Sequence, residues 1–314
     1  MIQPRRSKSI LAAGLLLVAA CSISTPSAHG LRVGRSKLLL GVYEPDDPGS
    51  YGQVVGFARA TGVWPDIVSY YSKWGTPFNE SFALQVYRHG GTTLVQLQPK
   101  YMSLHAIVDG QQDSYLGVYA KEVANFGHRV ILSVGQEMNG PWYSWGQGHV
   151  PPAEFIAAWR HIVDIFHRVT SANVTWLWDV NCNLTGHFPI EPWWPGSNYV
   201  NWVGLDCYYV YPSDTFVSIF RSTIEEIRSL TSKPIFIAET AVGRAAGPRK
   251  IKDLFSGASN AGLIGLLWFD ETQHGGLYHE DWRLEGNAAA LAAFKASARQ
   301  WGHGRYRVDV SYRN

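Results

Sequence analysis

The sequence has little charge and little cysteine. Charged residues make up 17% of its 314 positions, with 27 Lys and Arg against 25 Asp and Glu. No run of one sign occurs, so nothing indicates a nucleic-acid partner. The three cysteines form no CxxC pair and stand beside no histidine in a ligand pattern. We therefore expect no metal site, and no motif indicates a cofactor.

Long apolar runs are also missing, apart from one near the start. Residues Ile10–Ala20 are too few to span a bilayer comfortably, and they follow a basic stretch, as in a signal peptide. The run ends in VAAC, which resembles a bacterial lipobox and would place a lipid on Cys21. Cleavage after Ala28, which would discard Cys21, is the alternative. Either route predicts export, as a cell-envelope lipoprotein or a secreted protein, with membrane contact only through the lipid.

Aromatic residues, by contrast, are abundant. The chain has 13 Trp and 16 Tyr, and 46% of its residues are hydrophobic. This share allows a sizeable core and argues against bulk disorder. So many Trp and Tyr side chains also suit a cleft for ligands that have apolar faces and hydroxyl rims. Sugars are such ligands.

Eight short apolar runs recur along the chain, each followed by a segment with helical character. Their near-continuous apolarity is typical of parallel strands that are covered on both faces. The runs are Leu38–Tyr43, Ile67–Tyr71, Thr93–Leu97, Val130–Val134, Val174–Trp178, Val200–Leu205, Pro234–Ala238 and Ile264–Phe269.

The segments between these runs predict helices. Pro151–Thr170 carries its apolar residues on one face at a period of 3.6, and the stretch from Phe216 to Leu230 repeats the pattern. Asn287 is placed to cap a last helix that ends at Trp301. Eight strand–helix alternations predict an α/β protein with the (β/α)8 (TIM barrel) fold. A doubly wound sheet is the alternative, which the absence of GxGxxG and GxxxxGK[ST] loops disfavours.

These observations predict a single folded domain with additional segments at both ends. We expect a signal peptide with a candidate lipobox at 1–21 and a linker at 22–36. The barrel would occupy 37–301, and a polar tail would occupy 302–314. The protein is expected to be a monomer.

In a (β/α)8 barrel, functional residues lie at the C-terminal ends of the strands. Those ends hold acids, amides and aromatics, and the fourth and seventh carry Glu137 and Glu239. A pair of opposed carboxyl groups suits cleavage of a glycosidic bond, because one can protonate the leaving oxygen while the other attacks or activates water. Salt bridges or loop braces are the alternative roles. The ends read Tyr43-Glu44, Lys73-Trp74, Gln98, Gln136-Glu137, Asp179-Asn181, Asp206-Tyr208, Glu239 and Trp268-Asp270.

Several motifs resemble those of glycoside hydrolase family 26. The stretch QEMNGPWYSWG at 136–146 is similar to that family's acid/base motif. WPG at 194–196 followed by WVGLD at 202–206 resembles a second block, and PIFIAET at 234–240 resembles the nucleophile strand. WF at 268–269 and DWR at 281–283 match elements near the last strand. The resemblance covers roughly residues 38–295.

The resemblance implies a (β/α)8 enzyme that is retaining and endo-acting. Most members cleave β-mannans, and some cleave mixed-linkage β-glucan or β-1,3-xylan. It implies that Glu137 is the acid/base and Glu239 the nucleophile. The substrate-binding residues that we infer are Trp142 as a wall, Tyr208 as a hydrogen-bond donor to the nucleophile, Trp268 as the platform under the sugar, and Gln136 and Asn139 as groups that orient the acid and the sugar.

The chain departs from the family pattern at two positions. Gln136 stands where the family usually has histidine, so the tuning of the acid and the orientation of substrate are expected to differ. Cys207 stands where glycine is usual. Because Cys182 follows strand five and Cys207 follows strand six, a disulfide between them is possible, with two buried thiols as the alternative.

The leading hypothesis is a retaining endo-β-glycoside hydrolase whose partner is a polysaccharide, with β-1,4-mannan as the first substrate. β-1,3/1,4-glucan is the second. A transglycosylase that remodels glycans would use the same residues. A barrel that only binds polysaccharide is the alternative from another functional class.

Overall fold

The computed structural model describes Met1 and residues 37–169, 173–183, 186, 188–272 and 279–302. The chain divides into Met1–Gly34 and Arg35–Asn314, and all elements described below belong to the second unit. The predicted signal peptide, Cys21, the linker and all of the polar tail after Gly302 lie outside the described residues. They therefore stay predictions.

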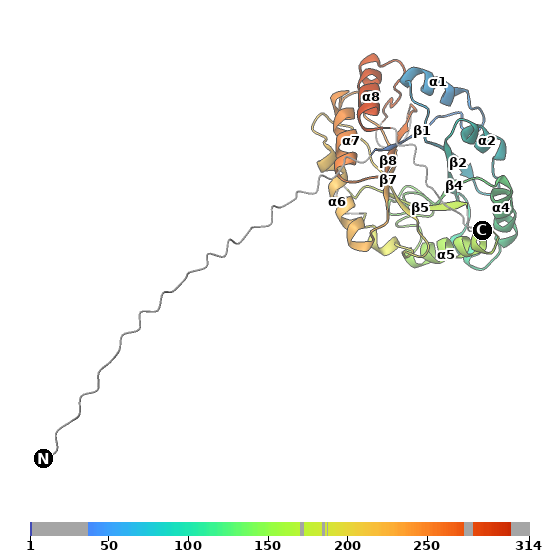
Figure 1. Ribbon diagram of the computed structural model, residues 1–314. Helices are drawn as coiled ribbons and strands as arrows, with labels where there is room; N and C mark the ends of the chain where they lie inside the picture. Colours follow the sequence, from blue (N-terminus) through green and yellow to red (C-terminus); the bar gives the residue numbers. More distant parts are fainter. Residues whose placement is uncertain (2–36, 170–172, 184–185, 187, 273–278, 303–314) are drawn as a thin grey trace. The chain divides into compact units, whose positions relative to one another are not determined.

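The described strands form one closed, parallel barrel in the order β1 to β8, with β1 paired to β8. Helices form a ring outside the strands (Figure 1). The strands are β1 (Leu39–Tyr43), β2 (Ile67–Lys73), β3 (Thr92–Gln98), β4 (Val130–Val134), β5 (Val174–Asn181), β6 (Trp202–Asp206), β7 (Ile235–Thr240) and β8 (Gly265–Phe269).

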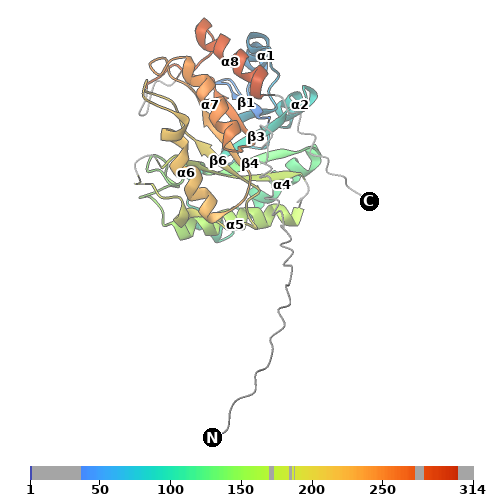
Figure 2. The same cartoon turned by 60° about the vertical axis from the view of Figure 1, so that its left-hand side comes forward.

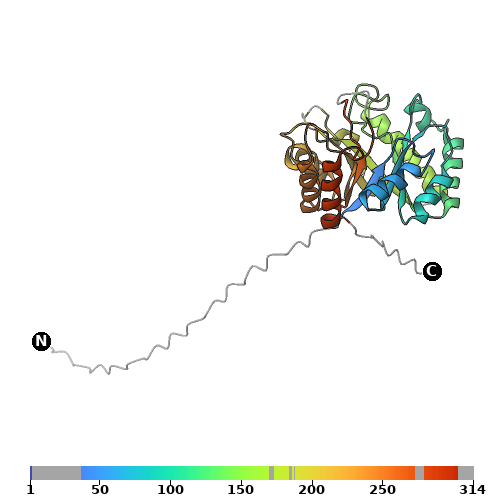
Figure 3. The ribbon, with the colours of Figure 1, turned by 90° about the horizontal axis from the view of Figure 1, so that it is seen from above.

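The helices alternate with the strands along the chain. They are α1 (Gly52–Thr61), α2 (Glu80–Arg88), α3 (Leu104–Val108), α4 (Asp113–Phe126), α5 (Pro152–Val169), α6 (Phe216–Leu230), α7 (Arg249–Asn260) and α8 (Ala288–Trp301), with the short 3-10 helix η1 (Glu191–Trp193) before β6. Helices α8 and α1 pack together, which closes the ring (Figures 1 and 2). Seen from above, the strands run through the middle of the molecule with the helices outside them (Figure 3).

The predicted (β/α)8 barrel is confirmed, and each apolar run is one of its strands. The largest boundary difference is at the end of β5, which continues to Asn181 instead of ending at Trp178. The predicted cap of α8 is also present, because the Asn287 side chain accepts a hydrogen bond from the backbone nitrogen of Ala290. Of the helices in the described ranges, none has both the length and the apolar character of a membrane span.

Two apolar layers follow from the alternation of side chains along each strand. One set of side chains fills the inside of the barrel, and the other packs between strands and helices. The inner set is Leu39, Tyr43, Ile67, Leu94, Ile131, Leu177, Phe236, Ala238 and Leu267. Residues next to them in sequence, such as Leu40 and Leu266, face the helices. This alternation decides which strand-end residues can reach the mouth of the barrel.

Candidate active site

Glu137 follows β4 in an unusual backbone conformation. Its φ is +54°, in the left-handed region that side chains other than glycine rarely occupy. Its backbone nitrogen donates to the carbonyl of Asp179 over 2.9 Å, and its carbonyl accepts from Gly140 over 2.9 Å. These bonds hold the turn in place. Strained backbone of this kind clusters at functional sites.

Two side chains hold the carboxylate of Glu137. Asn181 donates from Nδ2 to Oε1 over 2.5 Å, and Trp142 donates from Nε1 to Oε2 over 2.6 Å. Burial, followed by the negative charge of Glu239, raises the pKa of Glu137 to about 8, although both hydrogen bonds lower it. The group is therefore able to hold a proton near neutral pH.

Glu239 lies in β7 and receives two phenol hydrogen bonds. Tyr208 donates to Oε1 and Tyr71 donates to Oε2. The pKa of Glu239 lies above its ordinary value, because burial and the charge of Glu271 raise it more than the hydrogen bonds from the two tyrosines lower it. The pairing of β7 with β6 shifts next to Glu239, as in a β-bulge, and such irregularities re-aim side chains.

The two glutamates thus differ in their surroundings. The charge of Glu239 raises the pKa of Glu137. Burial raises the pKa of both groups, but two hydroxyl donors lower the pKa of Glu239, whereas the charge of Glu239 raises that of Glu137 further. A neutral acid and an ionised carboxylate facing one site are what glycosidic bond cleavage requires.

A second layer of acids lies beneath this pair. Asp179 and Asp206 are fully buried, and Gln96 donates from Nε2 to Oδ2 of Asp179 over 2.8 Å. Burial raises the pKa of both aspartates. Gly204 is needed here, because a Cβ on it would lie 2.3 Å from Oδ1 of Asp179.

Gln136 is buried next to the acid. Within the described protein, neither polar atom of its amide has a hydrogen-bond partner, although the amide lies close enough to lower the pKa of Tyr143. Its backbone carbonyl accepts from Trp145 over 2.9 Å. Gln136 lies beside the acid, as we expected. Its role in substrate binding stays a prediction.

Asn139 does not lie where a sugar could reach it, so the expectation that it orients the sugar is corrected. Its side chain is fully buried and donates to the carbonyls of Asn181 and Phe188 over 2.8 and 3.1 Å. It also accepts from the backbone nitrogen of Asn181 over 2.9 Å. Asn139 therefore fixes Asn181, which in turn holds Glu137.

Trp268 is likewise not a platform under the sugar. It points out of the barrel, is 1% exposed, packs edge-on against Phe294 of α8 and donates to the carbonyl of Trp282 over 3.0 Å. Strand alternation is the reason, because the next residue, Phe269, points to the mouth and stacks on Tyr43. Trp282, from the DWR motif, has its ring 4.7 Å from that of Tyr208.

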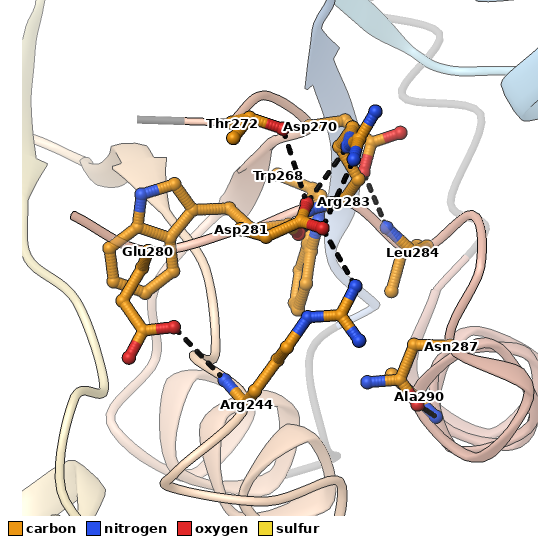
Figure 4. A network of polar contacts seen from close by, with 11 residues as sticks. Arg244, Trp268, Asp270, Thr272, Glu280, Asp281, Arg283, Leu284, Asn287 and Ala290 are labelled. Carbon is orange, nitrogen blue, oxygen red and sulfur yellow. Dashed lines mark hydrogen bonds and ion pairs between the residues drawn. The ribbon is translucent and has the colours of Figure 1, made fainter. Parts of the chain in front are cut away.

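The segment after β8 is held by a polar network (Figure 4). Arg244, from the loop after β7, donates to Asp281 over 2.7 Å, and Arg283 donates to the same carboxylate over 2.8 Å. Asp270 accepts from the backbone nitrogen of Leu284 over 2.7 Å. The network ties the β7 and β8 ends of the barrel together and fixes the segment that carries Trp282.

A polar cavity of about 290 Å³ opens at the ends of β1 and β8. It is lined by Glu44, Pro45, Gln53, Asp270, Glu271, Thr272, Arg283 and Glu285. Glu271 connects it electrostatically with the mouth, because its charge raises the pKa of Tyr43 and of Glu239. Within the described ranges, no group of three or more His, Cys, Asp or Glu side chains could hold a metal ion.

Cys182 and Cys207 form a disulfide at the ends of β5 and β6.

Two further residues, Tyr71 and Asn181, contact the glutamates. From the sequence, Tyr71 was assigned only to a strand, and Asn181 was named as a strand end without a role. No local motif marks Tyr71. Its position at the mouth follows from the register of β2 within the closed barrel.

A model of glycosyl hydrolase family 26 matches residues 67–297. Endoglucanase H of Acetivibrio thermocellus is 29% identical over 297 residues, which are 89% of this chain and 32% of that protein. Mannan endo-1,4-beta-mannosidase A and B of Caldalkalibacillus mannanilyticus is 32% identical over 98 residues, 29% of this chain and 18% of that protein. The chain thus spans about a third or less of the length of these relatives.

A solved structure of an endo-beta-1,4-mannanase double mutant from Cellulomonas fimi has the same fold. It aligns with a TM-score of 0.66 at 16% identity, over 87% of this chain and 73% of the mannanase. At this identity the likeness concerns the fold. The family model, in contrast, covers more than half of the chain and includes both glutamates. The chain therefore belongs to glycosyl hydrolase family 26.

Proposed function

We propose that this protein hydrolyses internal β-glycosidic bonds of a polysaccharide by double displacement. The observation that carries the proposal is the unequal environment of the two carboxyl groups. Glu239 receives hydrogen bonds from Tyr71 and Tyr208, while burial raises the pKa of Glu137 to about 8. The first group suits a nucleophile and the second a proton donor.

In the first step, Glu137 gives its proton to the glycosidic oxygen while a carboxylate oxygen of Glu239 attacks the anomeric carbon. The bond to the leaving sugar breaks and an ester between sugar and Glu239 forms. In the second step, Glu137, now ionised, takes a proton from water, and the resulting hydroxyl displaces Glu239. The carboxylate and the protonated acid are regenerated.

We propose β-1,4-mannan as the first substrate, on the basis of the family and of the mannanase relative. We propose β-1,3/1,4-glucan as the second candidate, and a specific observation supports a glucan. The endoglucanase relative matches nearly the whole chain, whereas the mannanase relative matches 29% of it. Gln136 is buried next to the acid in place of the family's usual histidine and cannot carry a charge, so it changes the surroundings of the acid.

Two experiments test the proposal. Initial rates on glucomannan, galactomannan, lichenan and β-1,3-xylan rank the substrates, and lichenan cleaved faster than both mannans would reverse our order. Glu239→Ala should abolish turnover, and azide should restore a product of inverted configuration. Glu137→Ala should slow substrates with poor leaving groups at least about 10²-fold more than activated aryl glycosides. Near-normal activity of either variant would refute its assigned role.

We also propose that the protein is exported and carries a lipid on Cys21. The support is the apolar run at Ile10–Ala20 with its lipobox-like end. Cys21→Ser should release the protein from a membrane fraction of the producing cells. A wild-type protein that is already soluble would instead favour cleavage after Ala28.

A further inference from the structure

The disulfide lies between the residues that hydrogen-bond the two catalytic candidates. Cys182 directly follows Asn181, and Cys207 directly precedes Tyr208. The Cα atoms of the two cysteines are 5.6 Å apart, and each residue is 3% exposed. One covalent bond therefore joins the neighbour of a Glu137 donor, Asn181, to the neighbour of a Glu239 donor, Tyr208.

Backbone hydrogen bonds extend this link to the glutamates themselves. The backbone nitrogen of Cys207 donates to the carbonyl of Glu239 over 3.0 Å, and that of Cys182 donates to Asp206 over 3.1 Å. On the other side, the backbone nitrogen of Glu137 donates to Asp179, in the same strand as Asn181. The ends of β4, β5, β6 and β7 thus form one connected unit with the cystine in its middle.

The cross-link lies where the strand ladder weakens. The pairing of β5 with β6 ends at Asn181 and Asp206, and the pairing of β6 with β7 shifts between Leu205 and Asp206. Beyond these points the end of β5 is joined to the end of β6 by the hydrogen bond from the backbone nitrogen of Cys182 to the carbonyl of Asp206 and by the cystine. Hydrogen bonds to a reacting group lose their effect when misplaced by about 1 Å.

We propose that the Cys182–Cys207 disulfide is a positioning element that holds Asn181 against Glu137 and Tyr208 against Glu239. The inference rests on the roles proposed above for the two glutamates. A disulfide that only stabilises the fold would restrict the unfolded chain and leave the chemistry unchanged. The two possibilities differ in what happens to the titration of the glutamates.

The expected direction follows from the hydrogen bonds. Asn181 lowers the pKa of Glu137, and Tyr208 lowers the pKa of Glu239. Without the cross-link both bonds loosen, so both pKa values rise. Glu239 must be ionised, so the acidic limb of the rate profile moves to higher pH. Glu137 must be protonated, so the alkaline limb moves to higher pH as well.

Other titratable groups face Glu137 and Glu239, and the substitutions that test the proposal do not alter them. They are Tyr43, Tyr71, Tyr143, Asp179, Asp206 and Glu271. A shift of both limbs in the same direction is therefore attributable to the two donors beside the cystine.

The test compares the wild type with the Cys182→Ser/Cys207→Ser double variant. We expect kcat to fall about tenfold with KM within about twofold, and both limbs to move to higher pH. Wild type treated with tris(2-carboxyethyl)phosphine should behave alike. The phosphine supplies two electrons, water supplies the oxygen and two protons, and the products are two thiols and the phosphine oxide. Because this route needs no substitution, the test stands even if the Ser variant fails to fold.

Leu254→Ala is the matched control, because Leu254 is buried in α7, outside the site. It should lower the melting temperature without moving either limb. A cross-link-free protein that keeps the wild-type kcat and pH profile, or changes only as the control does, would overturn the proposal. Carbon-13 NMR titration of Glu137 and Glu239 gives the same answer without substrate. If the wild type cleaves no β-glycan, the proposed function fails while this titration still decides the role of the disulfide.

Discussion

The indole nitrogen of Trp142 donates a hydrogen bond of 2.6 Å to Oε2 of Glu137. The same side chain is 46% exposed, so its ring is accessible from solvent at the mouth of the barrel. Trp142 therefore combines two properties: a donor that acts on the carboxyl group and an aromatic surface that a sugar ring can contact. The family motif places a tryptophan at this position but does not show which atom it holds.

Replacing Trp142 by Phe separates these two properties. Phe keeps an aromatic face and removes the donor that lowers the pKa of Glu137. Because Glu137 must be protonated, the alkaline limb of kcat/KM should move to higher pH, while the acidic limb stays. Trp142→Ala should in addition raise KM. pH–rate profiles of both variants check this, and an unmoved alkaline limb in Trp142→Phe would show that the hydrogen bond has no effect on the acid.

Replacing Tyr71 or Tyr208 by Phe should act on the opposite limb. Each phenol lowers the pKa of Glu239, which must be ionised to attack. The acidic limb should therefore move to higher pH, and kcat should fall about ten- to hundredfold, since a hydrogen bond to a charged group contributes about 1.5–3 kcal/mol. Tyr87→Phe, on the exposed part of α2, is the control. An acidic limb that moves equally in the control would refute the assignment.

Because the backbone of Glu137 is left-handed, we expect glycine at this position to give a more stable protein than alanine does. Because the φ of Glu137 is +54°, Glu137→Gly should be more stable to unfolding than Glu137→Ala by roughly 0.5–1 kcal/mol. At Arg221, in the middle of α6, the same two substitutions should show the reverse order. Urea unfolding of the four variants measures both differences. Equal signs at the two positions would mean that the backbone of Glu137 is unstrained.

We expect the buried amide of Gln136 to lower the stability of the protein while it supports activity. Its buried amide has no partner within the described protein, so Gln136→Met should raise the unfolding free energy by about 1–2 kcal/mol and lower kcat/KM. Gln96→Met should instead destabilise, because Gln96 donates to Asp179. Urea unfolding and kinetics check both, and a destabilised Gln136→Met would show that the amide is satisfied. Gln136→His that raises mannan activity would support the link between this position and substrate choice.

Glu44 should make the protein less stable as pH rises. Burial, followed by the charge of Asp270, raises the pKa of Glu44 above its usual 4.5. The folded state therefore holds the proton more tightly than the unfolded state, and stability is lost between the unfolded and folded pKa values. Glu44→Gln should gain stability relative to wild type from pH 5 to pH 9 in urea unfolding. Glu225→Gln, at an exposed ion pair on α6, is the control, and parallel pH trends would contradict the prediction.

The sequence by itself determined the barrel and the positions of the two glutamates at strand ends. Its eight apolar runs are the strands because a parallel strand covered on both faces needs continuous apolarity. The runs also placed Glu137 and Glu239 at strand ends, since the C-terminal ends of parallel strands gather at one edge. Local chemistry predicted the Asn287 cap in the same way.

Only the tertiary structure decided which neighbours reach those glutamates. Trp268 and Phe269 are adjacent in sequence, yet strand alternation sends the first toward α8 and the second to the mouth. Tyr71 reaches Glu239 from a strand 168 residues away, and Asn139 turns out to fix Asn181 instead of a sugar. These contacts depend on barrel closure and strand register, which set distances between residues far apart in the chain and leave no local pattern in the sequence.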